Sequence, residues 1–454
     1  MTKGKKKKEL TIEEKLEQAL VPREEWPYEV PENWCWVRLG DLYEINPKNN
    51  ADNNIESSFI PMEKIEAGFK SEFTYEIKTW GDAKKGHTQF ADGDVAFAKI
   101  SPCFENRKSM IIKGLKNGIG AGTTELIVLR QPLVDQMYTF WIVSSDDFVS
   151  KGKATYSGTV GQQRISMDYV RNYPIPLPPL PEQQRIVNRI ESLFSKLDEA
   201  KEKAQEALDS FEMRKAAILH KAFSGELTEK WREEKGVGID NWEIIKLSDC
   251  STSIGDGLHG TPVFDDNGEY YFVNGNNFQI DHLNIKPDTK KVNEEEYKKY
   301  YINLSKENTV FVSINGTLGK TSFYNDEPII LGKSACYINV NERIDKYYLR
   351  YYFETKEFID YANEKATGST IKNLGLKAIR NMEIRLPNIL EQRIIVKVLD
   401  DIIKNEYIYR EIIYDVLFQI DIIKKSILAK AFRGELGTNC LEEESSINIL
   451  KSII

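Results

Sequence analysis

Few of the residue types that carry out metal or nucleophilic catalysis occur in clusters along this chain of 454 residues. Its five cysteines and four histidines are scattered, with no Cys-x-x-Cys pair and no His-x-x-x-His pair. Zinc sites and disulfide frameworks both need closely spaced sets of these residues. The sequence therefore predicts reduced cysteines with structural roles, no metal site and no catalytic residue.

Two short motifs look like parts of enzyme sites but lack essential residues. NGTLGKT (Asn315–Thr321) ends like a phosphate-binding loop, yet Ile314 stands where the pattern G-x-x-x-x-G-K-[ST] requires its first glycine. NPKN, which begins at Asn46, lacks the second proline and the aromatic residue that hold a flipped base in an amino-methyltransferase. We therefore expect NGTLGKT to form a tight turn between strands. A methyltransferase or nuclease that acts alone is disfavoured.

The charge of the chain is acidic on average but basic in two stretches. The formal net charge of −8 argues against a simple nucleic-acid-binding protein. Five basic residues and one acidic residue nevertheless lie between Lys99 and Lys116, and four basic and no acidic residues lie between Lys365 and Arg380. A solvated face explains either stretch alone. The presence of one such stretch in each half of the chain calls for closer attention.

The N-terminal region reads neither as a membrane anchor nor as a secretory signal. No apolar run in the chain approaches the 18 or more residues that a membrane-spanning helix needs. The basic N-terminus, MTKGKKKKEL, is followed by charged residues rather than by the apolar core of a signal peptide. We expect a cytoplasmic protein whose residues 1–30 form a basic, partly disordered extension.

The chain repeats itself at a nearly constant interval. AILHKAFSGEL (Ala217–Leu227) recurs 209 positions later as SILAKAFRGEL, and NWCWVRLGDL at Asn33 recurs 208 positions later as NWEIIKLSDC at Asn241. The dipeptides Arg171-Asn172 and Glu182-Gln183 also recur after 209 positions. Because an internal repeat of this kind decides the architecture, we expect two similar domains.

Each repeat contains a long heptad pattern. Starting from a proline-rich segment in the first copy, apolar residues follow 4-3 spacing, which predicts long helices that pack lengthwise on a partner. Arg214 and Glu406 are the only breaks in this spacing. The predicted contact positions are Ile186, Ile190, Leu193, Leu197, Ala200, Ala204, Ala207, Phe211 and Ile218, then Ile395, Leu399, Ile402, Tyr409, Ile413, Val416, Ile420, Ile423 and Ile427. We expect the two helices to pair with each other, antiparallel.

The segments outside the helices have mixed character. Short β-branched and aromatic runs at 94–100, 125–130, 270–275, 308–314 and 334–340 predict strands, whereas 136–153 and 345–365 predict helices. The predicted fold is therefore α+β, with two pseudo-repeated globules separated by an antiparallel pair of long, coiled-coil-like helices. The expected segments are an extension (1–30), a first domain (31–178), a central spacer helix (179–227), a second domain (228–386), a C-terminal spacer helix (387–436) and a tail (437–454).

The predicted helices suggest what two such domains could bind. A helix from Glu182 to Phe223 would be about 63 Å long at 1.5 Å per residue. One turn of B-DNA is about 34–36 Å, so two domains held by such helices could read two half-sites on one side of a duplex. A pseudo-twofold relation between the domains would match the approximate dyad of the DNA backbone.

Several motifs resemble one family over about Pro22–Leu436. The residues that carry the resemblance are WPYEVPENWCWVRLGDL (Trp26–Leu42), IPLPPLPEQQRIVNRIESLFSKLDEA (Ile175–Ala200), DGLHGTP (Asp256–Pro262) and the two K-A-F-x-G-E-L copies. In these motifs the chain resembles the DNA specificity subunit of type I restriction-modification enzymes. It departs from the pattern in the weaker second proline segment, RLPNILEQR, and in the tail after Leu436, which has no sequence counterpart in the first half.

The resemblance implies a non-catalytic subunit of a bacterial defence complex. Two target recognition domains would each read one part of a bipartite site in double-stranded DNA. The paired helices would dock two methyltransferase subunits, and translocase-nuclease subunits would complete the restriction complex. S-adenosylmethionine, ATP and Mg would then be used by these partner subunits, with no cofactor bound by this chain and no contact with a membrane.

Side chains that could contact DNA lie in glycine-flanked polar segments. Lys and Arg bind phosphates, while Arg, Asn and Gln can make paired hydrogen bonds with base edges. SGTVGQQR (Ser157–Arg164) and TGSTIKN (Thr367–Asn373) occupy equivalent places before each Arg-Asn dipeptide, so we expect them to do the same job. The candidate DNA-binding residues are Lys99, Arg107, Lys108, Gln162, Gln163, Arg164, Asn274, Asn276, Asn277, Lys320, Lys372 and Asn373.

One other architecture fits the sequence. A coiled-coil scaffold with two protein-binding domains and no role on DNA would also have two repeats, and the acidic net charge favours it. A gel-shift assay with and without a methyltransferase partner distinguishes this scaffold from a DNA-binding subunit.

Overall fold

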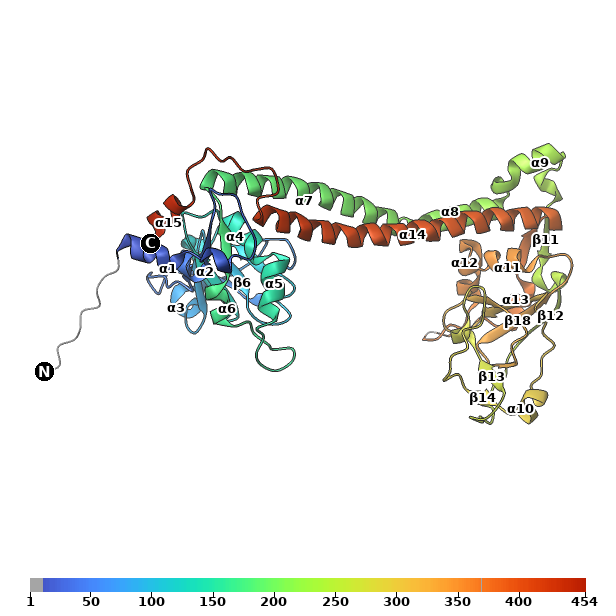
Figure 1. Cartoon of the computed structure of the whole chain (residues 1–454). Helices are drawn as coiled ribbons and strands as arrows, with labels where there is room; N and C mark the ends of the chain where they lie inside the picture. Colours follow the sequence, from blue (N-terminus) through green and yellow to red (C-terminus); the bar gives the residue numbers. More distant parts are fainter. Residues whose placement is uncertain (1–10, 369) are drawn as a thin grey trace. The chain divides into compact units, whose positions relative to one another are not determined.

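The computed structural model describes residues 11–368 and 370–454, which form two units (Figure 1). The first unit runs to Ala204 and also contains Asp415–Ile454, and the second comprises Gln205–Tyr414. Residues 1–10 of the predicted basic extension lie outside the described residues, whereas α1 (Ile12–Ala19) begins with a Thr11 capping box. Within the described ranges no helix is long and apolar enough to cross a membrane.

Each repeat begins and ends on a two-stranded ribbon. In the first unit, β1 (Cys35–Arg38) pairs antiparallel with β10 (Pro174–Leu177). In the second, β11 (Glu243–Lys246) pairs antiparallel with β19 (Glu383–Leu386). The repeated Asn-Trp segment thus leads directly into the first strand, and the second strand leads into the long helix. This ribbon fixes where each globule leaves its spacer helix.

The globule of the first unit contains two four-stranded sheets. One has the order β2 (Glu44–Ile45), β9 (Leu126–Arg130), β6 (Val95–Ala98) and β7 (Ser109–Ile111). The other has the order β4 (Glu76–Thr79), β3 (Glu56–Ile60), β8 (Ile119–Gly122) and β5 (Thr88–Ala91). The short helices α2 (Leu39–Leu42), α3 (Trp80–Ala83) and α6 (Met167–Asn172) complete it. Strands predicted at 94–100 and 125–130 are confirmed as β6 and β9.

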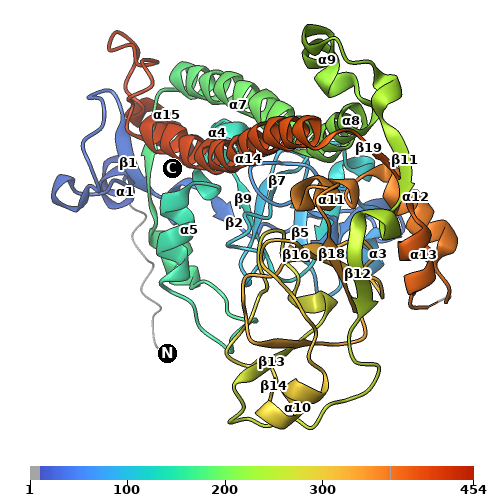
Figure 2. The ribbon, with the colours of Figure 1, turned by 90° about the vertical axis from the view of Figure 1, so that its right-hand side faces the viewer.

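The globule of the second unit repeats the first of these sheets. Its order is β12 (Ser251–Asp256), β18 (Ala335–Val340), β15 (Thr309–Ser313) and β16 (Thr321–Phe323). A smaller sheet has the order β14 (Lys291–Val292), β13 (Tyr270–Val273) and β17 (Ile329–Leu331). In both views β13, β14 and α10 (Glu294–Lys299) gather at one end of this globule, while α13 (Leu376–Asn381) precedes β19 (Figures 1 and 2). The α+β prediction and the strand predictions for this half are confirmed.

Each helix predicted inside a globule is a pair of short helices. The first is α4 (Gln136–Val143) followed by α5 (Asp146–Lys153), and the second is α11 (Lys346–Tyr352) followed by α12 (Lys356–Lys365). The second helix of each pair begins at a hydroxyl cap, because the side chains of Ser145 and Thr355 accept the backbone N–H groups of Phe148 and Phe358. A local cap therefore ends a run that looks continuous in composition.

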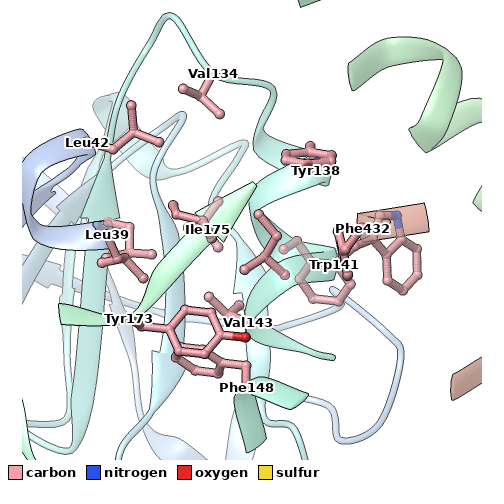
Figure 3. Packing of buried hydrophobic residues seen from close by; sticks show 14 of the residues in the cluster. Leu39, Leu42, Val134, Tyr138, Trp141, Val143, Phe148, Tyr173, Ile175 and Phe432 are labelled. Atoms are coloured by element: carbon pink, nitrogen blue, oxygen red, sulfur yellow. The ribbon is translucent and has the colours of Figure 1, made fainter. Parts of the chain in front are cut away.

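The core of the first unit is built largely from aromatic side chains. Figure 3 shows Tyr138 and Trp141 of α4 with Phe432, the last residue of the second spacer helix, α14 (Ile389–Phe432), and the Tyr138 and Phe432 rings meet edge to face at 5.7 Å. Phe148 packs on Tyr173 in the same way at 4.9 Å. Because edge-to-face pairs add to the free energy of apolar burial, this cluster joins the spacer helix firmly to the globule.

The two spacer helices differ in continuity. The single helix expected from Glu182 to Phe223 is wrong in detail, since α7 (Leu180–Asp209) and α8 (Phe211–Ser224) meet at Ser210. The Ser210 hydroxyl donates to the Ala207 carbonyl, which competes with the helical bonding pattern. The second spacer helix, α14 (Ile389–Phe432), runs through 44 residues without a break.

The spacer helices pack antiparallel within each unit. In the first unit Asp198 and Lys201 of α7 pair with Lys424 and Asp421 of α14. In the second unit Arg214 of α8 pairs with Glu406 of α14, with Nη2 and Nε at 2.7 and 3.1 Å from the carboxylate oxygens. The two breaks in the heptad pattern thus face each other.

Part of the predicted heptad contact surface is buried and part is not. Ile186 and Ile395, which are 209 positions apart, are both fully buried, as are Ile190 and Leu399. Three predicted contact residues of α14 are instead exposed, by 58, 41 and 43%, namely Tyr409, Val416 and Ile423. A straight helix drifts relative to a strict heptad, and α14 is apolar on more of its circumference than one neighbour covers.

The repeated Glu-Gln dipeptide explains why the repeated Trp is needed. Glu182 and Glu391 are fully buried, and their carboxylates accept the indole N–H of Trp34 at 2.7 Å and of Trp242 at 3.1 Å. The next residues, Gln183 and Gln392, accept backbone N–H groups at the N-caps of α4 and α11. The two repeated motifs are therefore one hydrogen-bonded connection between ribbon, helix and globule.

The tail after Leu436 has a structural counterpart that its sequence does not reveal. Arg232 of α9 (Glu229–Lys235) and Thr228 hydrogen-bond to Glu391, each at 2.7 Å. In the first unit Asn439 of the tail donates to Glu182 at 2.7 Å. Different residues thus satisfy the same buried carboxylate in the two units, and α15 (Ile447–Ile453) ends the chain.

Candidate nucleic-acid interface

Two hairpins at equivalent places are the most similar polar features of the globules. The first hairpin, Ser157–Arg164, and the second hairpin, Thr367–Asn373, are each closed by a pair of backbone hydrogen bonds between their end residues. Residue 369 of the second hairpin lies outside the described residues. Both hairpins also dock in the same way, so they occupy equivalent places in the two globules, and that they do the same job stays a prediction.

Each hairpin docks on the loop that follows the central strand of the shared sheet. In the first globule, Ser101 N–H donates to the Gln163 carbonyl at 2.8 Å and Ile165 N–H donates to the Lys99 carbonyl at 3.1 Å. In the second, Gly316 N–H donates to the Lys372 carbonyl at 2.9 Å and Leu374 N–H donates to the Ile314 carbonyl at 2.8 Å. Lys99 and Ile314 follow β6 and β15. Equivalent backbone hydrogen bonds therefore attach both hairpins to the same loop of the shared sheet, which we call the seat of the hairpin.

The hairpin tips project into solvent. Gly158, with φ of 110°, and Gly161, with φ of 82°, adopt the left-handed conformations that the first tip requires, and Gly368 does so in the second. Val160 is 95% exposed and Ile371 is 62% exposed. Gln162 is exposed and Gln163 is half-buried, and within the part of the chain that the structure describes neither side-chain amide has a partner. These amides are available to a ligand.

Arg164 and Lys99 lie beside each other but have different partners. The Arg164 guanidinium donates to both carboxylate oxygens of Glu125, at 2.7 and 2.9 Å, and to the Gln162 carbonyl at 2.9 Å. These hydrogen bonds and the charge of Arg164 hold the pKa of Glu125 below its usual value, with Lys99 contributing at longer range. Among the described residues the Lys99 ammonium has no hydrogen-bonding partner.

Arg107 and Lys108 are occupied by the protein itself. The Arg107 side chain is only 14% exposed and donates to the Ser144 carbonyl at 2.9 Å and to Asp146 at 2.6 Å. Lys108 Nζ donates to the Met62 carbonyl at 2.9 Å. Arg107 and Lys108 are both half-buried and engaged by these internal bonds, so we leave them out of the set that we propose to contact DNA.

In the second globule, the DGLHGTP loop and an asparagine-rich turn line one hollow. Asn274 and Asn277 hold the turn, because Asn274 Oδ1 accepts the Asn276 N–H and Asn277 Oδ1 accepts the Asn274 N–H, both at 3.0 Å. The Asn276 side chain is exposed. The residues lining the hollow include Gly260, Thr261, Pro262, Phe264, Phe272, Asn274, Asn276, Asn277, Lys286 and Lys290.

Sequence reasoning missed part of this hollow. Phe264 and Phe272 meet edge to face at 5.6 Å, and the Lys290 ammonium lies 4.4 Å from the centre of the Phe264 ring. The basic segment around Lys286, Lys290 and Lys291 was the available signal. His259, in the same loop, contacts Asp256 at 2.6 Å, which makes this motif a turn held by its own side chains.

Lys320, Lys372 and Asn373 are all exposed near the seat of the second hairpin. NGTLGKT forms a turn between β15 and β16, as predicted, with positive φ at Gly316 and Gly319. Lys372 Nζ contacts the Asn363 amide oxygen, a neutral partner that leaves the lysine charge uncompensated. A second hollow between this turn and α12 is lined by Gly316, Thr317, Leu318, Ile359, Asn363, Thr370, Ile371 and Lys372.

The cysteines and acidic residues provide no metal site in the described part of the chain. No group of three or more His, Cys, Asp or Glu side chains is placed to hold a metal ion there. The five cysteines are free thiols, and burial raises the pKa of Cys35 and of Cys250 to about 11. Thiols with such pKa values stay protonated and unreactive at neutral pH.

Comparison with known sequences places these domains in context. A family profile described as "Type I restriction modification DNA specificity domain" matches residues 31–208 and 239–414. The chain is 40% identical over 245 residues to the specificity subunit of the type I restriction enzyme EcoAI from Escherichia coli, covering 53% of this chain and 39% of that protein. The EcoEI specificity subunit from Escherichia coli is 41% identical over 219 residues, covering 46% and 37%. These matches span about two-fifths of both relatives.

Two solved structures have a similar fold over nearly the whole chain. The HsdS subunit from Thermoanaerobacter tengcongensis superposes with a TM-score of 0.65 at 21% identity, covering 90% of this chain and 99% of that one. A chain from work on complex assembly and conformational transition of the type I R-M system superposes with a TM-score of 0.67, also at 21% identity, covering 90% and 100%. At this identity the likeness concerns the fold.

Proposed function

Because the chain belongs to the type I restriction-modification DNA specificity family, we propose that it reads a bipartite site in double-stranded DNA, with one half-site for each target recognition domain. One observation carries the proposal. The two hairpins dock through the same backbone bonds in both domains but present different side chains, Gln162 and Gln163 in one and Lys372 and Asn373 in the other. A DNA target with two different half-sites requires two domains of the same build that present different side chains.

The proposed contact residues are a subset of the sequence candidates. In the first domain they are Lys99, Gln162 and Gln163. In the second they are Asn276, Lys320, Lys372 and Asn373. Lysines bind phosphates and amides read base edges, so each domain has both kinds of contact. Arg107, Lys108, Arg164, Asn274 and Asn277 hold the protein surface in shape instead.

The spacer helices carry apolar surface that partner subunits would cover. Exposed large apolar residues of α14 include Tyr407, Ile408 and Ile412 in the second unit, and Phe418 and Ile422 in the first. Apolar helix surface of this extent is a feature of protein interfaces. We propose that methyltransferase subunits dock there and that restriction subunits join the complex. The 44 residues of α14, about 66 Å of helix, would set the interval between half-sites.

The remaining assignments rest on the same family membership. Methyl transfer, DNA translocation and cleavage would belong to the partner subunits, together with S-adenosylmethionine, ATP and Mg. This chain would act in the cytoplasm without a catalytic residue of its own. The domain limits that we propose are 31–178 and 228–386 for the recognition domains, and 179–227 and 387–436 for the spacer helices.

Sequencing of methylated bases tests the proposed function directly. Cells that express this chain with its methyltransferase partner should acquire methylated adenines within one split motif. Replacing residues 228–386 with the corresponding domain of another specificity subunit should change one half of the motif only. Methylation at an unsplit motif, or a change in both halves, contradicts the proposal. A gel shift that stays negative with the partner present would favour the two-headed scaffold without a DNA role.

A salt titration tests one proposed phosphate contact. Lys372→Ala should weaken DNA binding and reduce the slope of log K against log salt by about one, because one fewer phosphate is neutralised. Lys356→Ala is the matched control, since Lys356 is exposed on α12 of the same domain and already pairs with Asp360. An unchanged slope for Lys372→Ala removes that residue from the interface.

A further inference from the structure

The two hairpins share a seat but are not held in the same way. In the first domain, Glu125 stands at the start of β9, where its carbonyl accepts the Lys99 N–H at 2.8 Å and its own N–H donates to the Thr123 hydroxyl at 3.2 Å. The carboxylate is therefore attached to rigid backbone. Arg164, at the end of the hairpin, donates hydrogen bonds from Nε and Nη2 to this carboxylate.

The third bond of Arg164 reaches the hairpin tip. Nη1 donates to the Gln162 carbonyl at 2.9 Å, so one planar guanidinium ties the start of β9 to the tip that carries the two glutamines. A bidentate arginine–carboxylate pair fixes orientation as well as distance. The segment Thr159–Gln162 is a turn with its own backbone bond, from the Gln162 N–H to the Thr159 carbonyl at 2.9 Å, and Arg164 attaches this turn to the start of β9.

Among its described residues, the second domain has no such pair. Ser334 occupies the place of Glu125, because its carbonyl accepts the Ile314 N–H as the Glu125 carbonyl accepts that of Lys99. The Ser334 hydroxyl accepts the Gly275 N–H and thus holds the asparagine-rich turn rather than the hairpin. Asn373 stands where the first hairpin has Arg164 and is exposed. The second hairpin accordingly keeps its polar side chains for a ligand.

From these contacts we propose that Arg164 is a positioning residue, which with Glu125 forms a clamp that directs Gln162 and Gln163 at the first half-site, while Lys99 beside it supplies the phosphate contact. The proposal rests on the proposed function and deepens it. The carboxylate of Glu125 already compensates the charge of the Arg164 guanidinium. Arg164 therefore neutralises no phosphate and adds nothing to the counterions released when DNA binds. The Lys99 ammonium has no such partner.

The test uses the full chain in complex with its methyltransferase partner and a duplex that carries the split motif. Glu125→Gln and Arg164→Ala should each weaken binding by roughly tenfold, and the double variant should be no weaker than either, because both remove the same clamp. Arg164→Ala should leave the salt slope unchanged, because the paired guanidinium neutralises no phosphate, and Glu125→Gln, which frees the Arg164 charge, should not lower the slope. Lys99→Ala should lower the slope by about one.

The clamp also predicts which half of the site is affected. With Glu125→Gln, a wrong base in the first half-site should cost less affinity than it does with the unchanged protein, whereas a wrong base in the second half-site should cost the same. Glu56→Gln is the matched control, since Glu56 forms an exposed ion pair with Lys116 in the same domain. It should change neither the affinity nor the discrimination.

Several outcomes overturn the clamp. If Arg164→Ala flattens the salt slope while Glu125→Gln has no effect, Arg164 is itself a phosphate contact. If the two single losses add in the double variant, or if both half-sites lose discrimination, the residues do not act as one unit. Thermal unfolding checks each variant, and Glu125→Gln alone carries the test if Arg164→Ala does not fold. Absence of split-site binding by the unchanged protein would instead refute the proposed function.

Discussion

The two recognition domains are built on one frame and differ in how polar groups are held on it. Both start with a Trp whose indole N–H reaches a buried glutamate at the head of a spacer helix. In the second unit this glutamate, Glu391, is paired with Arg232, whereas in the first Glu182 has only neutral donors among the described residues, namely Asn439 and Thr438 besides Trp34. At the hairpins the ion pair is instead in the first unit, between Arg164 and Glu125, and the described residues of the second hairpin form none. Residues that repeat in the sequence build the architecture shared by both domains, and residues that do not repeat decide which polar side chains each domain leaves exposed.

The largest expected effect tests the difference between the two buried glutamates. Glu391→Ala should destabilise the second unit by about 3–5 kcal/mol, because it leaves the buried Arg232 guanidinium without its partner. Glu182→Ala should cost about 1–3 kcal/mol, because only neutral donors lose their acceptor. Denaturant unfolding of both variants measures the two losses. Equal losses would mean that the charge of Arg232 contributes nothing to the stability of the second unit.

A smaller effect is expected when the indole donors are removed. Trp34→Phe should cost about 1–3 kcal/mol, because Trp34 is buried and donates the 2.7 Å bond to Glu182. Trp242→Phe should cost less, about 0.5–1 kcal/mol, since Trp242 is only half-buried, its bond to Glu391 is longer at 3.1 Å, and the charged Arg232 still donates to Glu391. The same unfolding measurement applies. A larger loss for Trp242→Phe would reverse the comparison of the two connections.

The pH dependence of the first unit should reveal the ion pair of its tail. Hydrogen bonds from Arg185 lower the pKa of Glu443 in the folded protein. A lowered folded-state pKa means that the pair contributes stability above the ordinary carboxyl pKa, and that this contribution is lost as pH falls through the lowered value. Unfolding temperatures of the unchanged protein and of Glu443→Gln should therefore converge toward acid pH. Curves that stay parallel would exclude this pair as a stabilising contact.

The smallest effect is expected at the ion pair between the spacer helices. Arg214→Leu together with Glu406→Leu should change stability by only about 0–1 kcal/mol, because both side chains are partly exposed and surface pairs contribute little. The residues that stand 209 positions from these two are Ile423 and Leu197, so the double variant makes the second unit resemble the first. Thermal unfolding gives the difference. A loss of several kcal/mol would identify the pair as a determinant of helix register.

Periodicity and repetition were enough to predict much of the fold. The antiparallel helices, the α+β globules and the strands β6, β9, β13, β15 and β18 could all be predicted, because local spacing determines which face of an element is apolar. The break at Ser210 and the caps at Ser145 and Thr355 were missed, since a side chain that bonds its own backbone leaves the hydrophobic pattern unchanged.

The candidate interface was harder to predict than the fold. The equivalence of the hairpins could be read from the repeat, and the exposed lysines Lys320 and Lys372 were found by type and position. Residue type could not separate Arg164 and Arg107 from them, because the partners Glu125 and Asp146 lie 39 positions away in the sequence. The two phenylalanines of the hollow in the second domain gave no polar signal at all.

The sequence by itself determined the frame of this protein: two domains, two long helices and the Trp–Glu connection, all of which follow from side chains that repeat at fixed intervals. The tertiary structure alone decided which charged groups remain for a ligand. A cation binds phosphate only if no carboxylate of its own chain already compensates its charge, and folding brings such carboxylates from distant positions, as Glu125 is brought to Arg164.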